Sequence, residues 1–114
     1  MKTFTAWRKS APDSSELLER CQTAVQAITP DATLILYGSR ARGTASLDSD
    51  YDLLILVEQL TQQLEDQLGD QLYTLELEYG VILSTLVYER HVWDSPLSKA
   101  MPLHQSIEQE GVLV

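Results

Sequence analysis

The chain has 114 residues, of which seventeen are acidic and eight are basic, so its formal net charge is −9. This length suits one domain over residues 1–114, and the acidity excludes a chain built for direct nucleic-acid binding, which needs clustered lysine and arginine. No apolar run approaches the about 18 residues that a membrane span needs. The polar N-terminus and the single cysteine favour a cytoplasmic protein without an internal disulfide, with self-association left open.

The first elements in chain order are a loose lead-in over residues 1–12 and a helix over residues 13–28. Asp13 followed three residues later by Glu16 is typical of a helix N-terminus. Apolar residues then recur at helical spacing, namely Leu17, Leu18, Cys21, Val25 and Ile28. Because Cys21 lies on this stripe, we interpret it as a core residue and not as a reactive thiol.

Two short apolar segments, residues 33–37 and 50–57, predict strands that are covered on both faces. Between them, residues 39–43 are expected to form a helical turn that ends at Gly43, followed by a polar loop over residues 44–49.

A strongly periodic helix is predicted over residues 59–79, with Gly80 at the position of a helix-ending glycine. Its leucine stripe resembles a short zipper, but a helix packed on a sheet shows the same stripe, and we favour core packing. A third strand is expected over residues 81–88. The order of elements predicts an α/β (α+β) fold, a small mixed sheet with helices packed on it.

The C-terminal part is predicted to contain a loop marked by Pro96 and Pro102, a short helix over residues 104–110 and an added edge strand at residues 112–114. Trp7 and Trp93 fall in segments without regular structure, where each is either an interface anchor or a buried loop residue. His91 and His104 lack a second ligand at useful spacing, so no zinc site is expected. His104 is interpreted as an ordinary polar residue of the last helix.

Three features that carry chemistry converge between residues 38 and 52. Gly38-Ser39 follows a buried strand, and a glycine there lets the backbone approach a phosphate closely. Asp50 and Asp52 are two residues apart in a strand, so both carboxylates project from one side and are suited to bind Mg²⁺. Arg40 and Arg42 follow the Gly-Ser pair directly and offer planar guanidinium groups that suit phosphate oxygens.

Together these residues resemble the signature of the nucleotidyltransferase superfamily typified by DNA polymerase β. That signature is Gly-Ser, about ten residues, and Asp-x-Asp; here ten residues separate Gly38-Ser39 from Asp50-Tyr51-Asp52. The short chain looks like the minimal nucleotidyltransferase (MNT) branch, which keeps the catalytic palm alone.

The resemblance implies that Asp50 and Asp52 are catalytic and ligate two Mg²⁺ ions. It also implies that Gly38, Ser39, Arg40 and Arg42 bind ATP or another NTP. Small members of this branch are similar to antitoxins paired with HEPN-type toxins, and some transfer AMP to a tyrosine of the toxin. The expected function is therefore NMP transfer onto an acceptor protein, with AMP from ATP as the expected case.

One departure from the superfamily pattern supports an alternative. The superfamily usually places a third carboxylate on the next strand, whereas residues 81–88 contain no acid, and Ser84 is the polar residue nearest the middle. Glu76, Glu78 and Glu89 are expected outside this strand. The alternative is a weakly active or inactive binding module that neutralises its partner by forming a complex.

Overall fold

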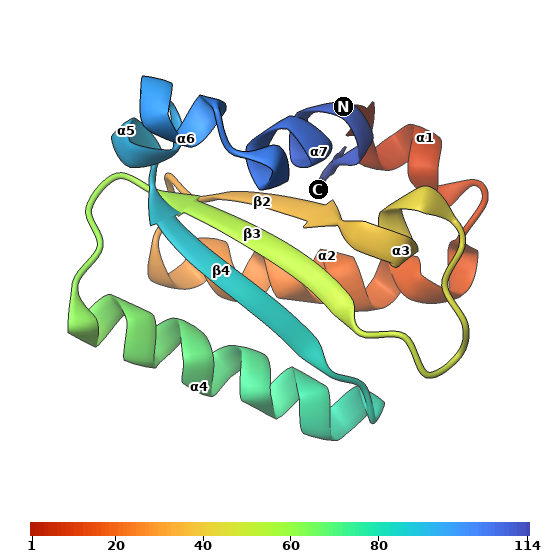
Figure 1. The fold of residues 1–114 in the computed structure, drawn as a ribbon. Coiled ribbons are helices and arrows are strands. Elements are labelled where there is room, and N and C mark those ends of the chain that lie inside the picture. The colour runs from red at the N-terminus through yellow and green to blue at the C-terminus, as the bar shows by residue number, and fades with distance from the viewer.

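The computed structural model describes residues 1–114 and shows helices on both faces of one five-stranded sheet (Figure 1). The strands are β1 (Lys2–Thr3), β2 (Thr33–Tyr37), β3 (Tyr51–Val57), β4 (Leu83–Glu89) and β5 (Val112–Leu113). Their spatial order is β1-β5-β2-β3-β4, in which β2 is antiparallel to β3 and β5, and the β3/β4 and β1/β5 pairs are parallel. The predicted mixed sheet carrying helices is confirmed.

The helices form two layers around this sheet. They are α1 (Phe4–Arg8), α2 (Pro12–Ile28), α3 (Gly38–Arg42), α4 (Gln62–Tyr79), α5 (Arg90–Trp93), α6 (Pro96–Lys99) and α7 (Pro102–Glu110). The long helices α2 and α4 cover one face, and α5, α6 and α7 lie over the other (Figure 1). None of the helices combines the length and apolarity that a bilayer crossing requires.

The side chains of β3 alternate between the two layers and so explain its continuous apolar sequence. Leu53 and Ile55 belong to the larger core cluster, which includes residues of α2 and α4. Leu54 and Leu56 belong to a second cluster with residues of α5 and α7. A strand that is buried on both faces needs apolar residues at every position.

The helix stripes of the sequence correspond to buried side chains, as predicted. Cys21 is fully buried on α2, and its burial raises the thiol pKa to about 12, so the thiol is not poised to react. On α4, Leu68, Leu72 and Leu75 are buried in the core, which confirms core packing of the stripe. Gly80 ends α4 with a positive φ of 65°, as expected for its position.

The prediction of a loose lead-in over residues 1–12 is wrong. This segment contains β1, which pairs with β5, and α1, whose Trp7 is buried. The Trp7 indole Nε1 donates to the carbonyl oxygen of Arg40 at 3.1 Å, so the segment is tied to α3. A two-residue strand and a five-residue helix leave no hydrophobic periodicity that a sequence pattern could detect.

Several boundaries also differ from the prediction, and prolines explain most of them. Pro12, Pro96 and Pro102 are the first residues of α2, α6 and α7, since proline suits the first helical position. Asp13 therefore lies within the first turn of α2 and does not cap it. Trp93 is buried in α5 and not in an irregular segment.

Three further predictions, all for the C-terminal part of the chain, differ from the structure. β5 lies between β1 and β2 and is not an edge strand. β4 extends to Glu89, which was placed outside the strand. His104 lies on the last helix, as predicted, but it is buried and stacked on Trp93 with ring centroids 4.3 Å apart, because α7 turns this side toward α5.

Candidate active site

The predicted Gly-Ser turn lies against the Asp-x-Asp pair. β2 ends at Tyr37, and α3 begins at Gly38, whose φ of +74° is a conformation that favours glycine. A Cβ atom at Gly38 would lie 2.2 Å from Oδ2 of Asp52. Glycine is therefore required at position 38 both by the backbone and by the space that the Asp52 carboxylate occupies.

Strand register places three polar side chains in one row. Tyr37 of β2 is the partner of Asp52 of β3, and Asp52 is the partner of Ser84 of β4. Register partners lie on the same face of a sheet. Asp52 alternates with Tyr51 and Leu53, so it faces the layer of α5, α6 and α7. Asp50 precedes β3 by one residue, and the alternation predicts the same side for it.

The electrostatics of the pair indicate two carboxylates close together. The pKa of Asp52 is raised, mainly by burial and further by the charge of Asp50, while Arg42 opposes the rise. The pKa of Tyr37 is also raised, first by burial and then by the charges of Asp52 and Tyr88. Two like charges in this arrangement favour a bound cation between them.

The donor set fits a divalent cation that takes its remaining ligands from substrate and water. Neither the Asp50 nor the Asp52 side chain accepts a hydrogen bond within the chain, so their oxygens are free to ligate. Neither this site nor any other part of the chain contains a group of three His, Cys, Asp or Glu side chains that could hold a metal ion. Mg²⁺ is commonly held by one or two carboxylates together with phosphate oxygens, which is what this pair can offer.

Arg40 holds the loop that leads into the carboxylate pair. Its guanidinium donates to the carbonyl oxygen of Ser49 at 2.9 Å and to that of Leu47 at 3.3 Å. The same group stacks over the ring of Tyr51, 4.3 Å from the centroid. These contacts position residues 47–51 around Asp50, and the predicted role of Arg40 in nucleotide binding stays a prediction.

Arg42 lies on the other side of α3. Its Nη1 pairs with Oε1 of Glu110 at 3.0 Å, and nearly half of its side chain is exposed. Lys2, Arg40 and Arg42 line a depression of about 510 Å³, which we call the basic pocket.

Ser39 lies on the first turn of α3, and its carbonyl oxygen accepts from the N–H groups of Gly43 and Thr44.

The family comparison accounts for this combination of turn, spacing and carboxylates. The family model described as a nucleotidyltransferase domain matches residues 14–112, which covers β2, α3, β3, α4 and β4. The chain belongs to the nucleotidyltransferase domain family. Among curated proteins, none matches the chain. The match places the chain in the polymerase β-like superfamily, whose members transfer NMP and generally use an NTP and a divalent metal.

This nucleotidyltransferase has no acid beside Asp52 on the next strand. Ser84, which is exposed, occupies that position. Glu78 forms an ion pair with Arg20, and Glu89 accepts from the backbone N–H of Leu60 at 3.0 Å. Glu89 is also five residues along β4 from Ser84, a separation of about 16 Å.

Glu76 is the one of these three glutamates that shares a pocket with Asp50. It projects from α4, and its Oε2 accepts from the backbone N–H of Leu83 at 2.8 Å. The sequence pattern predicted no role for Glu76 or Tyr37. Because Tyr37 directly precedes Gly38 in the sequence, its closeness to the site could have been predicted. The approach of α4 to residue 50 could not, because no local sequence pattern indicates it.

Proposed function

We propose that this nucleotidyltransferase moves AMP from ATP onto a partner protein, with Asp50 and Asp52 binding two Mg²⁺ ions. The observation that carries the proposal is the contact between Gly38 and Asp52, which brings the phosphate-binding turn against the carboxylate pair. Phosphoryl and nucleotidyl transfer depend mostly on positioning and on charge stabilisation, so this contact is the part that matters most.

The residues around the proposed nucleotide site have different roles. Gly38 and Ser39 hold the triphosphate at the end of β2, and Arg42 contributes positive charge from the basic pocket. Arg40 keeps the loop of Asp50 in place through the carbonyl oxygens of Leu47 and Ser49. When bound, Mg²⁺ neutralises negative charge on the phosphates.

A protein acceptor is proposed because the chain is acidic. Its charge of −9 disfavours a nucleic-acid acceptor. A protein acceptor that carries its own recognition surface fits these facts. We propose a HEPN-type toxin as this partner, with the chain acting as its antitoxin in the cytoplasm.

A second candidate is a binding module that neutralises the partner by forming a complex. Ser84 at the position beside Asp52 favours it, because the chain then lacks an acid to accept the proton of the attacking hydroxyl. The free Asp50 and Asp52 carboxylates favour the transferase, since a binding module has no need of two uncompensated charges next to one another.

Intact-mass measurement tests the proposed transfer. The chain and its co-purifying partner are incubated with Mg²⁺ and each of the four NTPs, and both proteins are weighed. We expect one AMP added to the partner, and a rate about a thousandfold lower for Asp50→Asn with Asp52→Asn.

The matched control is Asp66→Asn with Asp70→Asn, which removes the same charge from exposed positions of α4. Its rate should equal that of the unsubstituted chain. A stable complex without a mass change for any nucleotide would establish the binding module instead.

A further inference from the structure

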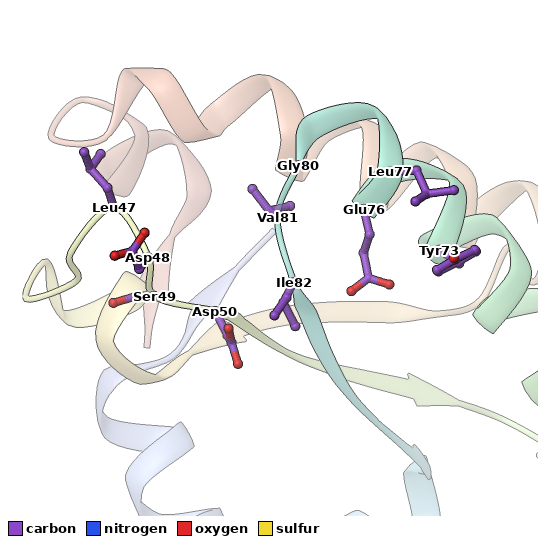
Figure 2. A pocket seen from close by; sticks show the side chains of 10 residues that line it. All are labelled: Leu47, Asp48, Ser49, Asp50, Tyr73, Glu76, Leu77, Gly80, Val81 and Ile82. Carbon is purple, nitrogen blue, oxygen red and sulfur yellow. The ribbon is translucent and has the colours of Figure 1, made fainter.

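A pocket of about 530 Å³ lies beside Asp50, between the loop of residues 47–50 and the end of α4 (Figure 2). Its other walls come from the turn after α4 and the start of β4, at residues 80–82. In the view of Figure 2, Ile82 lies between Asp50 and Glu76. We call this the acceptor-side pocket. It shares Asp50 with the carboxylate pair, so a group bound in it lies next to the reacting centre.

The walls of this pocket expose large apolar side chains. Leu47 is 97% exposed and Leu77 is 67% exposed, and Tyr73 and Ile82 are also more than half exposed. These four side chains surround one depression and come from the loop, from α4 and from the turn that precedes β4. Clustered exposed apolar side chains mark surfaces that bind other molecules.

The charged groups of the acceptor-side pocket are all acidic. Asp48, Asp50 and Glu76 line it, and no lysine, arginine or histidine does. Glu76 uses Oε2 to accept from Leu83, while its Oε1 accepts no hydrogen bond within the chain. Such a lining repels a triphosphate and attracts a cationic side chain.

We propose that the acceptor-side pocket binds a basic segment of the acceptor protein, with a hydroxyl-bearing side chain beside Asp50. An apolar side chain of that segment packs on Leu77 and Ile82, and a lysine or arginine next to it lies against Glu76. The reaction of this bound segment with the nucleotide rests on the proposed function. The complementary charge and the continuity with Asp50 select this occupant over the nucleotide.

The chemistry at this site is a single displacement. The acceptor hydroxyl oxygen forms a bond to the α-phosphorus of the NTP while the bond from that phosphorus to the bridging oxygen breaks. Pyrophosphate leaves with the electron pair of the broken bond, and the hydroxyl proton passes to solvent water. The pocket contributes by holding the attacking oxygen at the correct position.

Two synthetic peptides test the inference. One carries a single tyrosine between lysine and leucine residues, and the other has glutamate in place of each lysine. Amide chemical shifts of the isotope-labelled chain report binding without any reaction, and peptide mass after incubation with Mg²⁺ and ATP reports transfer. We expect the basic peptide to shift the amides of Leu77 and Ile82, and the acidic peptide to leave them unchanged.

Matched variants give the inference a quantitative check. Leu77→Ser should weaken basic-peptide binding about tenfold, whereas Leu97→Ser, the same change at an 80% exposed site on α6, should have no effect. Glu76→Gln, which keeps an oxygen for the Leu83 N–H, should also weaken binding, and Glu65→Gln on the exposed face of α4 should not. ATP affinity should be equal in all four variants.

The outcomes separate this inference from the proposed function. If the basic peptide shifts no amide around the pocket, or binds Leu77→Ser as well as the unsubstituted chain, the acceptor-side pocket is wrongly assigned even if AMP transfer to the partner occurs. If the peptide binds there as expected but neither peptide nor partner gains AMP, the docking surface is supported and the transferase is not.

Discussion

The basic pocket and the acceptor-side pocket differ in charge although one segment contributes to both. Residues 40–43 help to line the basic pocket, and residues 47–50 help to line the acceptor-side pocket. The first contains three basic side chains, and the second contains three carboxylates and an apolar wall. The ten residues between Gly-Ser and Asp-x-Asp therefore do more than join two motifs. They separate a basic depression from an acidic, partly apolar one.

Among substitutions that leave both carboxylates in place, Gly38→Ala is expected to disturb the site most, because position 38 lies against Asp52. The new Cβ would force the Asp52 carboxylate to move, and alanine also disfavours the positive φ. We expect about a 100-fold loss of transfer rate, since displacement of a reacting group by about 1 Å has this effect. Unfolding by urea should show a destabilisation of about 1–2 kcal/mol.

Gly69→Ala is the control for that prediction. Gly69 lies inside α4, and a Cβ there meets no atom within 4 Å. The substitution should stabilise the chain by about 0.5–1 kcal/mol and leave transfer unchanged. Equal activities of the Gly38→Ala and Gly69→Ala variants would contradict the close contact between the turn and Asp52.

Arg42→Gln should disturb the basic pocket alone. The variant loses a positive charge that faces Asp52 and an exposed ion pair with Glu110. We expect the KM for ATP to rise about threefold, the size typical of an exposed charge, with an unchanged KM for the acceptor. Steady-state kinetics with each substrate varied in turn measure both constants. Arg8→Gln, which removes an exposed pair with Glu19, is the matched control, and a rise in the acceptor KM would show that the two pockets are not separate.

The smallest expected effect is the change in stability that Asp52→Asn causes in the absence of metal. Burial and Asp50 raise the pKa of Asp52 above its unfolded value, so the folded state binds the proton more tightly. Stability is therefore lost as the pH rises through the interval from the unfolded to the raised folded pKa. In chelator at pH 7, Asp52→Asn should melt at a slightly higher temperature than the unsubstituted chain, because solvent screens the partly exposed carboxylate and keeps the effect small.

The pH profile supplies the check on that prediction. The difference in Tm should vanish below the usual aspartate pKa of about 4, because Asp52 is then neutral in both states. Asp70→Asn, on the exposed face of α4, is the control for the removal of one negative charge. A Tm lower than that of the unsubstituted chain at pH 7 would contradict this prediction. It would mean that the folded state favours the charged Asp52 carboxylate.

The sequence predicted the parts of the site that depend on local pattern. The apolar runs at residues 33–37 and 51–57, the turn ending at Gly43 and the Asp-x-Asp spacing are all visible in a single stretch of chain. A strand of five to seven buried residues leaves a clear signal, as does a helix with a leucine stripe. From the sequence alone, Gly38 is expected directly after one strand and Asp52 within the next strand along the chain.

The parts that were missed depend on contacts between distant segments. The two-residue strand β1 has no periodicity, and it pairs with β5, which was predicted as a strand but at an edge of the sheet. Proline at residues 96 and 102 is equally typical of loops and of helix starts. Glu76 lies at the pocket of Asp50 because of how α4 packs on the sheet, and no sequence pattern near position 76 predicts this.

The position of β5 also bears on synthesis of the chain. β5 pairs with β2 on one side and β1 on the other, so until residues 112 and 113 have left the ribosome β2 has an open edge. An unpaired strand edge is a template for aggregation. β2 leads directly into Gly38, so the proposed nucleotide-binding turn lacks one side of its support until β5 has paired with β2.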